Sequence, residues 1–129
     1  MHKGSCLCGA VAFEVAADLD APIACHCKQC RQQSGHYFSA VAAPKGAVKF
    51  HRDSTLEWYR HTDIATRGFC TNCGSTLFWR GDASAKIMVA MGSLDQPAGL
   101  RLAGHYWFDF KGDYYTVDDG LPQYEGEAP

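Results

Sequence analysis

The sequence predicts an all-β protein, and three observations support this. Short segments alternate apolar and polar residues, as at Val11, Phe13 and Val15, which would share one face of a strand. Gly, Pro, Asp and Ser interrupt these segments at short intervals. Only residues 28–34 have a helical pattern, and they amount to about two turns. We therefore expect packed antiparallel sheets of about nine short strands.

Turn residues separate the expected strands along the chain. Residues 44–46 and 52–54 supply two of these turns, and the Gly-Asp pairs at 81–82 and 112–113 supply two more. No repeat or low-complexity segment interrupts the pattern. The segments expected to form strands are residues 10–15, 36–42, 47–51, 56–60, 65–69, 76–80, 86–91, 106–110 and 114–117.

Length and composition favour one soluble domain spanning residues 1–129. Hydrophobic residues make up 47% of the chain, which is enough for a core, and 12 basic against 14 acidic residues give a net charge of −2. This balance argues against nucleic acid as a partner. The longest apolar run, residues 87–91, is too short to span a membrane, and the first residues do not resemble a secretory signal. We expect a cytoplasmic protein without a membrane partner.

The seven cysteines are the most informative residues. An odd number cannot form a complete set of disulfides, and disulfides are rare in the cytoplasm. The cysteines form the groups C-x-C, C-x-C-x-x-C and C-x-x-C, a clustering typical of metal ligands. Redox-active pairs and buried free thiols are the alternatives. The positions are Cys6, Cys8, Cys25, Cys27, Cys30, Cys70 and Cys73.

The first and last groups together suit a closed, structural metal site. Cys6 and Cys8 would share a face if the backbone between them bends, and glycines at positions 4 and 9 would permit unusual dihedral angles. Cys70 and Cys73 form a C-x-x-C turn followed by glycine, which is typical of a metal knuckle. Four thiolates leave no open coordination position. The alternative is that Cys6 and Cys8 only pack in the core.

The middle group suits an open metal site. Cys25 and Cys27 would share a face, Cys30 would return by a C-x-x-C turn, and His26 would point the other way. Three protein ligands with a vacant fourth position are typical of catalytic zinc. Zinc with three thiolates carries a charge of about −1, so it polarises water weakly and suits the binding of a soft thiol as thiolate. Carbon–sulfur chemistry is therefore favoured over hydrolysis.

These motifs resemble the glutathione-dependent formaldehyde-activating enzymes, a family that includes the centromere protein V domain. The resemblance runs over nearly the whole chain. It lies in the stretches GSCLCGAV at 4–11, CHCKQCR at 25–31 followed by Ser-Gly at 34–35, RGFCTNCGS at 67–75, MGSLD at 91–95 and GLPQY at 120–124.

The resemblance implies a β-tent fold held together by two zinc ions. It implies structural zinc on Cys6, Cys8, Cys70 and Cys73, and catalytic zinc on Cys25, Cys27 and Cys30. The activity it implies is that of a carbon–sulfur lyase, which in reverse joins glutathione and formaldehyde to S-hydroxymethylglutathione. The expected partners are thus a small thiol such as glutathione and a small aldehyde.

Several other residues have both a functional and an ordinary interpretation. Lys28, Arg31 and Arg67 would either bind a substrate carboxylate or, as we favour, be solvated surface charges. His36 would be a general base or simply a polar strand residue. The aromatic run at 105–110 would line a pocket or pack in the core. None of these is assigned a catalytic role.

The leading hypothesis is a zinc-dependent carbon–sulfur lyase or thiol–aldehyde adduct-forming enzyme. A non-catalytic, zinc-stabilised interaction module is the alternative, and a redox sensor that releases zinc on oxidation is a third interpretation. A pocket leading to the middle group would favour the enzyme, whereas a flat, covered site would favour the module.

Overall fold

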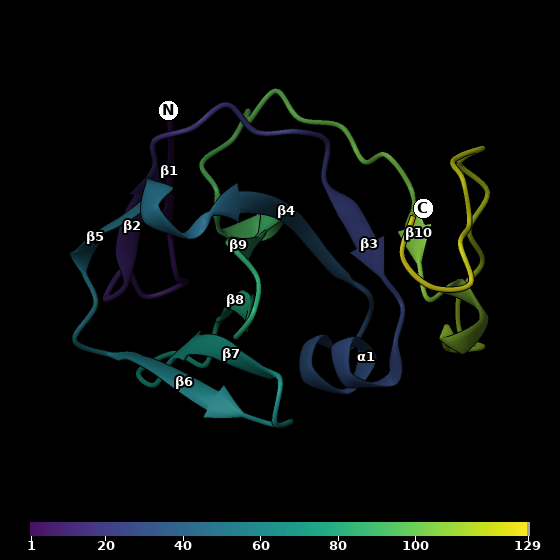
Figure 1. Cartoon of the computed structure of the whole chain (residues 1–129), viewed down its shortest axis with the longest axis horizontal. Helices are drawn as coiled ribbons and strands as arrows, with labels where there is room; N and C mark the ends of the chain where they lie inside the picture. The colour runs from purple at the N-terminus through teal and green to yellow at the C-terminus, as the bar shows by residue number, and fades with distance from the viewer. Residues whose placement is uncertain (129) are drawn as a thin grey trace.

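A computed structural model describes residues 1–128 and confirms the all-β prediction (Figure 1). The strands form two sheets, and the one α-helix within the described residues, α1, is Lys28–Ser34, where the sequence predicts it. No helix in residues 1–128 has the length and apolar character needed to cross a membrane. In Figure 1 the small sheet lies at the left, and β10 lies at the right with the C-terminal segment.

The small sheet has three antiparallel strands in the order β1-β2-β5. Its face toward the core carries Phe13 and Val15, which are buried as their alternation predicts. Gly4 lies in the first strand against Phe13, and a Cβ there would come within 2.5 Å of the Phe13 ring. The strands are β1 (His2–Ser5), β2 (Ala12–Val15) and β5 (Val48–Arg52).

The large sheet has seven strands in the order β10-β3-β4-β9-β8-β7-β6. Its neighbours are antiparallel except for β10 and β3, which are parallel. The strands are β3 (Ile23–Cys25), β4 (Phe38–Pro44), β6 (Leu56–Arg60), β7 (Ala65–Cys70), β8 (Thr76–Gly81), β9 (Lys86–Ala90) and β10 (His105–Tyr106). Three short 3-10 turns are η1 (Lys45–Ala47), η2 (Met91–Ser93) and η3 (Phe108–Phe110).

Some predicted boundaries are wrong. Strands β1 and β3 are not predicted, because each is short and carries little alternating apolar pattern. The strand expected at 36–42 begins only at Phe38. The strand expected at 106–110 stops at Tyr106, because Trp107 has φ +53° and the chain then enters η3. Residues 114–117 form no strand.

The two faces of the large sheet serve different purposes. On β4, Val41 and Ala43 face the main core, where Phe78 and Val89 pack with the small sheet. Ala40 and Ala42, which alternate with these two residues, point to the other side, where they line a cavity. Helix α1 packs near this second face through Cys30, which clusters with residues of β4. The alternation of β4 thus separates a filled core from an open pocket.

Candidate functional site

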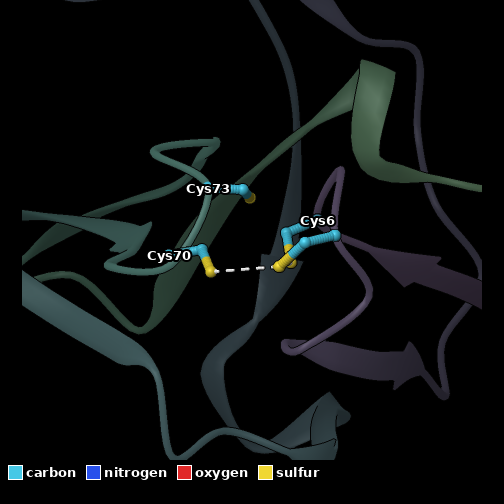
Figure 2. Close-up of side chains that lie close together, drawn as sticks. Cys6, Cys70 and Cys73 are labelled. Carbon is cyan, nitrogen blue, oxygen red and sulfur yellow. Dashed lines mark hydrogen bonds between the residues drawn. The ribbon is translucent and has the colours of Figure 1, made fainter.

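The four cysteines of the first and last groups converge into one cluster. Their sulfur atoms all lie within 4.8 Å of one another. The Sγ atoms of Cys6 and Cys8 are 3.6 Å apart, and those of Cys8 and Cys70 are 3.8 Å apart. Sulfurs around tetrahedral zinc are separated by about 3.8 Å, so the cluster has the dimensions of a Cys₄ zinc site. Figure 2 shows the side chains of Cys6, Cys70 and Cys73 directed toward a common centre.

Two turns, far apart in the sequence, build this cluster. Cys6 and Cys8 lie in the turn after β1, where Gly9 has φ +79° and the Gly9 N–H donates to the Cys6 carbonyl. Cys70 ends β7, and Gly74, with φ +78°, closes the C-x-x-C turn by donating to the Cys70 carbonyl. The structure thus contains the predicted bend at Cys6 and Cys8 and the predicted C-x-x-C turn at Cys70 and Cys73. Gly4 is not needed for an unusual dihedral angle; it permits the close approach of Phe13.

Hydrogen-bond donors surround the four sulfurs. Val11 N–H donates to Cys6 Sγ at 3.3 Å, and Asn72 Nδ2 donates to Cys8 Sγ at 3.2 Å. The hydroxyls of Thr55 and Ser75 lie 3.3 and 3.1 Å from the sulfurs of Cys70 and Cys73 respectively. Hydrogen bonds of this kind stabilise thiolates at a metal site.

The pKa values of these thiols reflect the same contacts. Hydrogen bonds from the Ser75 side chain and backbone lower the pKa of Cys73 to about 5, and the Thr55 hydroxyl lowers the pKa of Cys70. Burial raises the pKa of Cys6. Hydrogen bonds thus favour the thiolates of Cys70 and Cys73, whereas burial disfavours the thiolate of Cys6.

The middle group forms a second cluster, the cysteine trio Cys25, Cys27 and Cys30. Their sulfurs also lie within 4.8 Å of one another, and within residues 1–128 no His, Asp, Glu or further Cys joins them. Cys25 ends β3, Cys27 is the N-cap of α1, and Cys30 lies in its first turn. Cys27 Sγ accepts from the Cys30 N–H at 3.4 Å. The predicted three-donor set is therefore assembled in space.

Three thiols this close cannot all ionise without a positive charge. Hydrogen bonds from the Cys25 and Cys30 thiols lower the pKa of Cys27, and the same sharing with Cys27 raises the pKa of Cys25. Only one thiolate is therefore favoured in the metal-free trio. A divalent cation would allow the others to form.

A cavity of about 640 Å³ opens onto the trio. All three cysteines line it, together with residues from one row across the large sheet. In this row Arg67 pairs with Trp79, Trp79 with Met88, and Met88 with Ala42 on neighbouring strands, so the four side chains share one face. The volume lies within the range of small-molecule sites.

Arg67 is buried, which overturns the interpretation of this residue as a solvated charge. The residue has 6% of its surface exposed, and its guanidinium donates to the side-chain oxygens of Gln33 at 2.8 Å and Gln29 at 3.0 Å. Its Nη1 lies 4.0 Å from Cys30 Sγ. Among the described residues no carboxylate pairs with it. A buried cation needs a counter-charge, and the nearest candidate is a thiolate of the cysteine trio.

The other candidates divide between the cavity and its surroundings. Lys28 is exposed and lines the cavity, whereas Arg31 and His36 do not. His36 lies before β4 and contacts the ring of Tyr115 instead. Of the aromatic run, Tyr106, Trp107 and Phe110 line the cavity, while His105 and Phe108 pack against His26.

His26 heads a chain of hydrogen bonds that sequence reasoning missed. The sequence predicts only that its ring points away from the trio, and it does so, being fully buried. Its Nδ1 contacts the Tyr115 hydroxyl, and its Nε2 lies 2.9 Å from His105 Nδ1. His105 Nε2 in turn lies 2.7 Å from the Asp119 carboxylate. Burial lowers the pKa of His26 to about 4, so this ring is neutral at neutral pH.

Consistent donor roles can be assigned along this chain. The Tyr115 O–H donates to His26, His26 Nε2–H donates to His105, and His105 Nε2–H donates to Asp119. Burial raises the pKa of Tyr115, which keeps its hydroxyl protonated as this assignment requires. The backbone between Cys25 and Cys27 is thereby tied to the C-terminal segment. A sequence signal for this contact would have been the two histidines, but 79 residues separate them.

Comparison with known proteins places these features in a family. An uncharacterised lyase of Schizosaccharomyces pombe is 28% identical over 78 residues, which cover 60% of this chain and 56% of that protein. The chain thus aligns with little more than half the length of this relative. A crystal structure of a Rhodobacter sphaeroides protein has a TM-score of 0.64 at 21% identity and covers 94% of this chain and 98% of its own, so the two share a fold.

The match to a family is more extensive. The sequence profile of the glutathione-dependent formaldehyde-activating enzymes matches residues 1–109, which include all seven cysteines and every strand. The two clusters of cysteine sulfurs are consistent with zinc sites in such a protein. The chain belongs to the family of glutathione-dependent formaldehyde-activating enzymes.

Proposed function

We propose that this protein is a zinc-dependent carbon–sulfur lyase that makes and cleaves adducts of a small thiol with an aldehyde. The observation that carries the proposal is the cysteine trio in the wall of a 640 Å³ cavity, with three converging sulfurs and no fourth protein donor among residues 1–128. Zinc bound by Cys25, Cys27 and Cys30 would supply a position that holds a thiol in its thiolate form. Family membership supports this class of reaction.

The four-cysteine cluster would hold a second, structural zinc. Cys6, Cys8, Cys70 and Cys73 supply four sulfurs, so the coordination of this ion would be complete. The cluster joins the turn after β1 to the turn between β7 and β8. Binding energy at such a site contributes directly to folding.

In the adduct-forming direction, the thiol sulfur adds to the aldehyde carbon. A new S–C bond forms, the π electron pair of the carbonyl moves to oxygen, and that oxygen takes up the proton that the thiol lost. The reverse reaction breaks the S–C bond and restores the carbonyl. No oxidant or reductant is consumed, and the product is a hemithioacetal.

Arg67 would balance the charge of the site. Three thiolates and a zinc ion sum to about −1, and a thiolate substrate would bring the total to about −2. The Arg67 guanidinium is held beside Cys30 by the two glutamines of α1, where it offsets part of this charge. Lys28 at the cavity would supply a second cation.

The cavity also bears on the alternatives. A non-catalytic interaction module has no need of a pocket that reaches its metal ligands, so the cavity supports the enzyme instead. The redox-sensor interpretation would use the same trio, but it gives no role to the cavity that opens onto these cysteines. Glutathione and formaldehyde are the first pair to assay, since the family is named for them.

The test is a panel of thiols and aldehydes assayed with the zinc-loaded protein. We expect at least one pair to react faster than the uncatalysed rate, and we expect Cys30→Ser to abolish the excess. A protein that binds zinc at the trio but accelerates no pair would contradict the proposal and favour the interaction module.

A further inference from the structure

The cavity is apolar beyond the cysteine trio. On the sheet side its floor is formed by Ala42, Met88, Trp79 and Phe38. At the edge of this sheet, Tyr106 of β10 and the aromatic side chains of Trp107 and Phe110 in the segment that follows complete the walls. Apart from the sulfurs, the polar side chains at the cavity come chiefly from α1 and from Arg67. A large part of any occupant would therefore contact hydrocarbon.

The backbone conformation of Trp107 fixes part of this aromatic wall in place. It is one of the exposed large apolar residues, with 39% of its surface accessible, and it has φ +53°, a conformation that residues other than glycine rarely adopt. Its backbone N–H donates to the Gly126 carbonyl, which holds it in place. An exposed indole maintained in an unfavourable backbone conformation at a cavity is typical of a ligand contact.

We propose that the substrate of this site carries an apolar group about the size of an aromatic ring, which occupies the cavity lined by Met88 and Trp107. This inference rests on the function proposed above and concerns its substrate class. The ring can belong to the thiol or to the aldehyde, because the adduct joins both at the trio. In either case the preferred adduct is more hydrophobic than that of glutathione with formaldehyde.

Glutathione is poorly matched to these walls for a physical reason. It carries two amide groups, two carboxylates and an ammonium group, and each needs a partner when removed from water. The floor offers methyl, thioether and aromatic groups, and Glu127 is the one acidic side chain among the described residues at the cavity. Of the two cations at the cavity, Arg67 already donates to two glutamines, which leaves Lys28 for the two carboxylates of glutathione. A phenyl group, by contrast, makes no such demands and gains from burial.

Binding and turnover together test the proposal with the zinc-loaded protein. The probes are phenylmethanethiol, 2-mercaptoethanol and glutathione, each offered with formaldehyde and with phenylacetaldehyde. Binding is followed by tryptophan emission, because two of the three tryptophans, Trp79 and Trp107, line the cavity. Benzyl alcohol, which has the ring but no thiol, reports the apolar cavity independently of the zinc chemistry.

We expect phenylmethanethiol to bind at least about tenfold more tightly than 2-mercaptoethanol, since the ring replaces a small polar group. Where the thiol is 2-mercaptoethanol, phenylacetaldehyde should react with a kcat/KM above that of formaldehyde if the ring enters with the aldehyde. Tighter binding of phenylmethanethiol would place the ring on the thiol, whereas a higher kcat/KM for phenylacetaldehyde would place it on the aldehyde.

Two variants locate the binding. Ala42→Leu places a larger side chain into the cavity beside Met88 and should weaken binding of phenylmethanethiol by about tenfold while changing that of 2-mercaptoethanol little. Met88→Ala should retain binding of the phenyl group and admit a naphthyl group. Ala85→Leu, the same substitution at an exposed turn outside the cavity, should change neither.

The outcomes separate this inference from the proposed function. If glutathione binds as tightly as phenylmethanethiol or more tightly, and reacts faster with formaldehyde than the ring-bearing reactants do, the proposed function stands and the proposed substrate class is wrong. Binding of benzyl alcohol that Ala42→Leu abolishes, without a response to any thiol, would overturn the function and with it the substrate. Ring-dependent binding and turnover that only the cavity variants alter would support both.

Discussion

The two cysteine clusters present the same ligand atom to very different surroundings. The four-cysteine cluster lies at two turns, with Cys6 and Cys70 buried in the main core and neutral donors around its sulfurs. The trio lies at the start of α1, beside a cavity and a buried arginine. A complete ligand set within a core suits stability. An incomplete set at a cavity suits the binding of substrate.

The comparison predicts that the largest effect follows from breaking the four-cysteine cluster. Cys70→Ser should unfold or severely destabilise the domain, because Cys70 is fully buried and structural zinc sites contribute about 10 kcal/mol or more to folding. Thermal melts followed by circular dichroism measure the loss. A Cys70→Ser protein that melts within a few degrees of the unmodified chain would contradict a structural role for this cluster.

Breaking the trio should affect metal binding far more than folding. Cys30→Ser should lose the metal of the trio while the domain remains folded, because Cys30 packs in a small cluster with Phe38 and Ala40 and not in the main core between the two sheets. Zinc analysis and a thermal melt of the same sample check both parts. Equal melting losses for Cys30→Ser and Cys70→Ser would remove the distinction between the clusters.

Replacing Arg67 tests whether its buried positive charge strengthens zinc binding at the trio. Arg67→Met should weaken zinc binding at the trio by about tenfold, because it removes the one buried cation beside Cys30 within the described residues. Arg80→Met is the matched control, since Arg80 covers the ring of Trp58 and not the trio. Competition with a zinc chelator measures both variants, and equal affinities would contradict charge balance by Arg67.

The sequence predicts the division of the cysteines but not the surroundings of each cluster. The spacing C-x-C, C-x-C-x-x-C and C-x-x-C is local, so it indicates which side chains can share a metal. The burial of Arg67 depends on its partners Gln29 and Gln33, which lie 38 and 34 residues away. No periodicity in β7 distinguishes an arginine facing a cavity from one facing solvent.

The walls of the cavity were equally hard to predict. The sequence predicts a continuous strand over residues 106–110, which would place alternate aromatics on two faces. The positive φ of Trp107 breaks that alternation and brings both Trp107 and Phe110 to the cavity. The alternation of β4, by contrast, correctly separates Val41 from Ala42.

Breaking the hydrogen-bond chain that links His26, His105 and Asp119 should affect zinc binding at the trio less than the loss of a cysteine ligand. His105→Phe keeps a ring of similar size but removes both bonds, so the backbone between Cys25 and Cys27 loses its tie to Asp119. We expect zinc to leave the trio several-fold faster, as for other residues that orient metal ligands, while the four-cysteine cluster keeps its zinc. Unchanged release from both clusters would limit the chain to a packing role.

The smallest predicted effect concerns Asp119 and pH. The Leu121 N–H and the His105 ring hold the pKa of Asp119 below its usual range. Its contribution to stability is therefore present at neutral pH and is lost as the pH falls through the lowered pKa. Asp119→Asn should lower the Tm by about 2 °C or less at pH 7, with the difference vanishing in acid. A difference that grows as the pH falls would contradict this assignment.

The central claim is that one cluster is closed and the other is open, and the release of zinc to a chelator tests it most directly. The purified, zinc-loaded protein should contain two zinc ions and release them in two phases of about one ion each. The faster phase should be missing in Cys30→Ser and should slow when a small thiol is added. A protein that binds a single zinc through cysteines of both clusters, or that releases two ions in one phase insensitive to thiols, would contradict the claim.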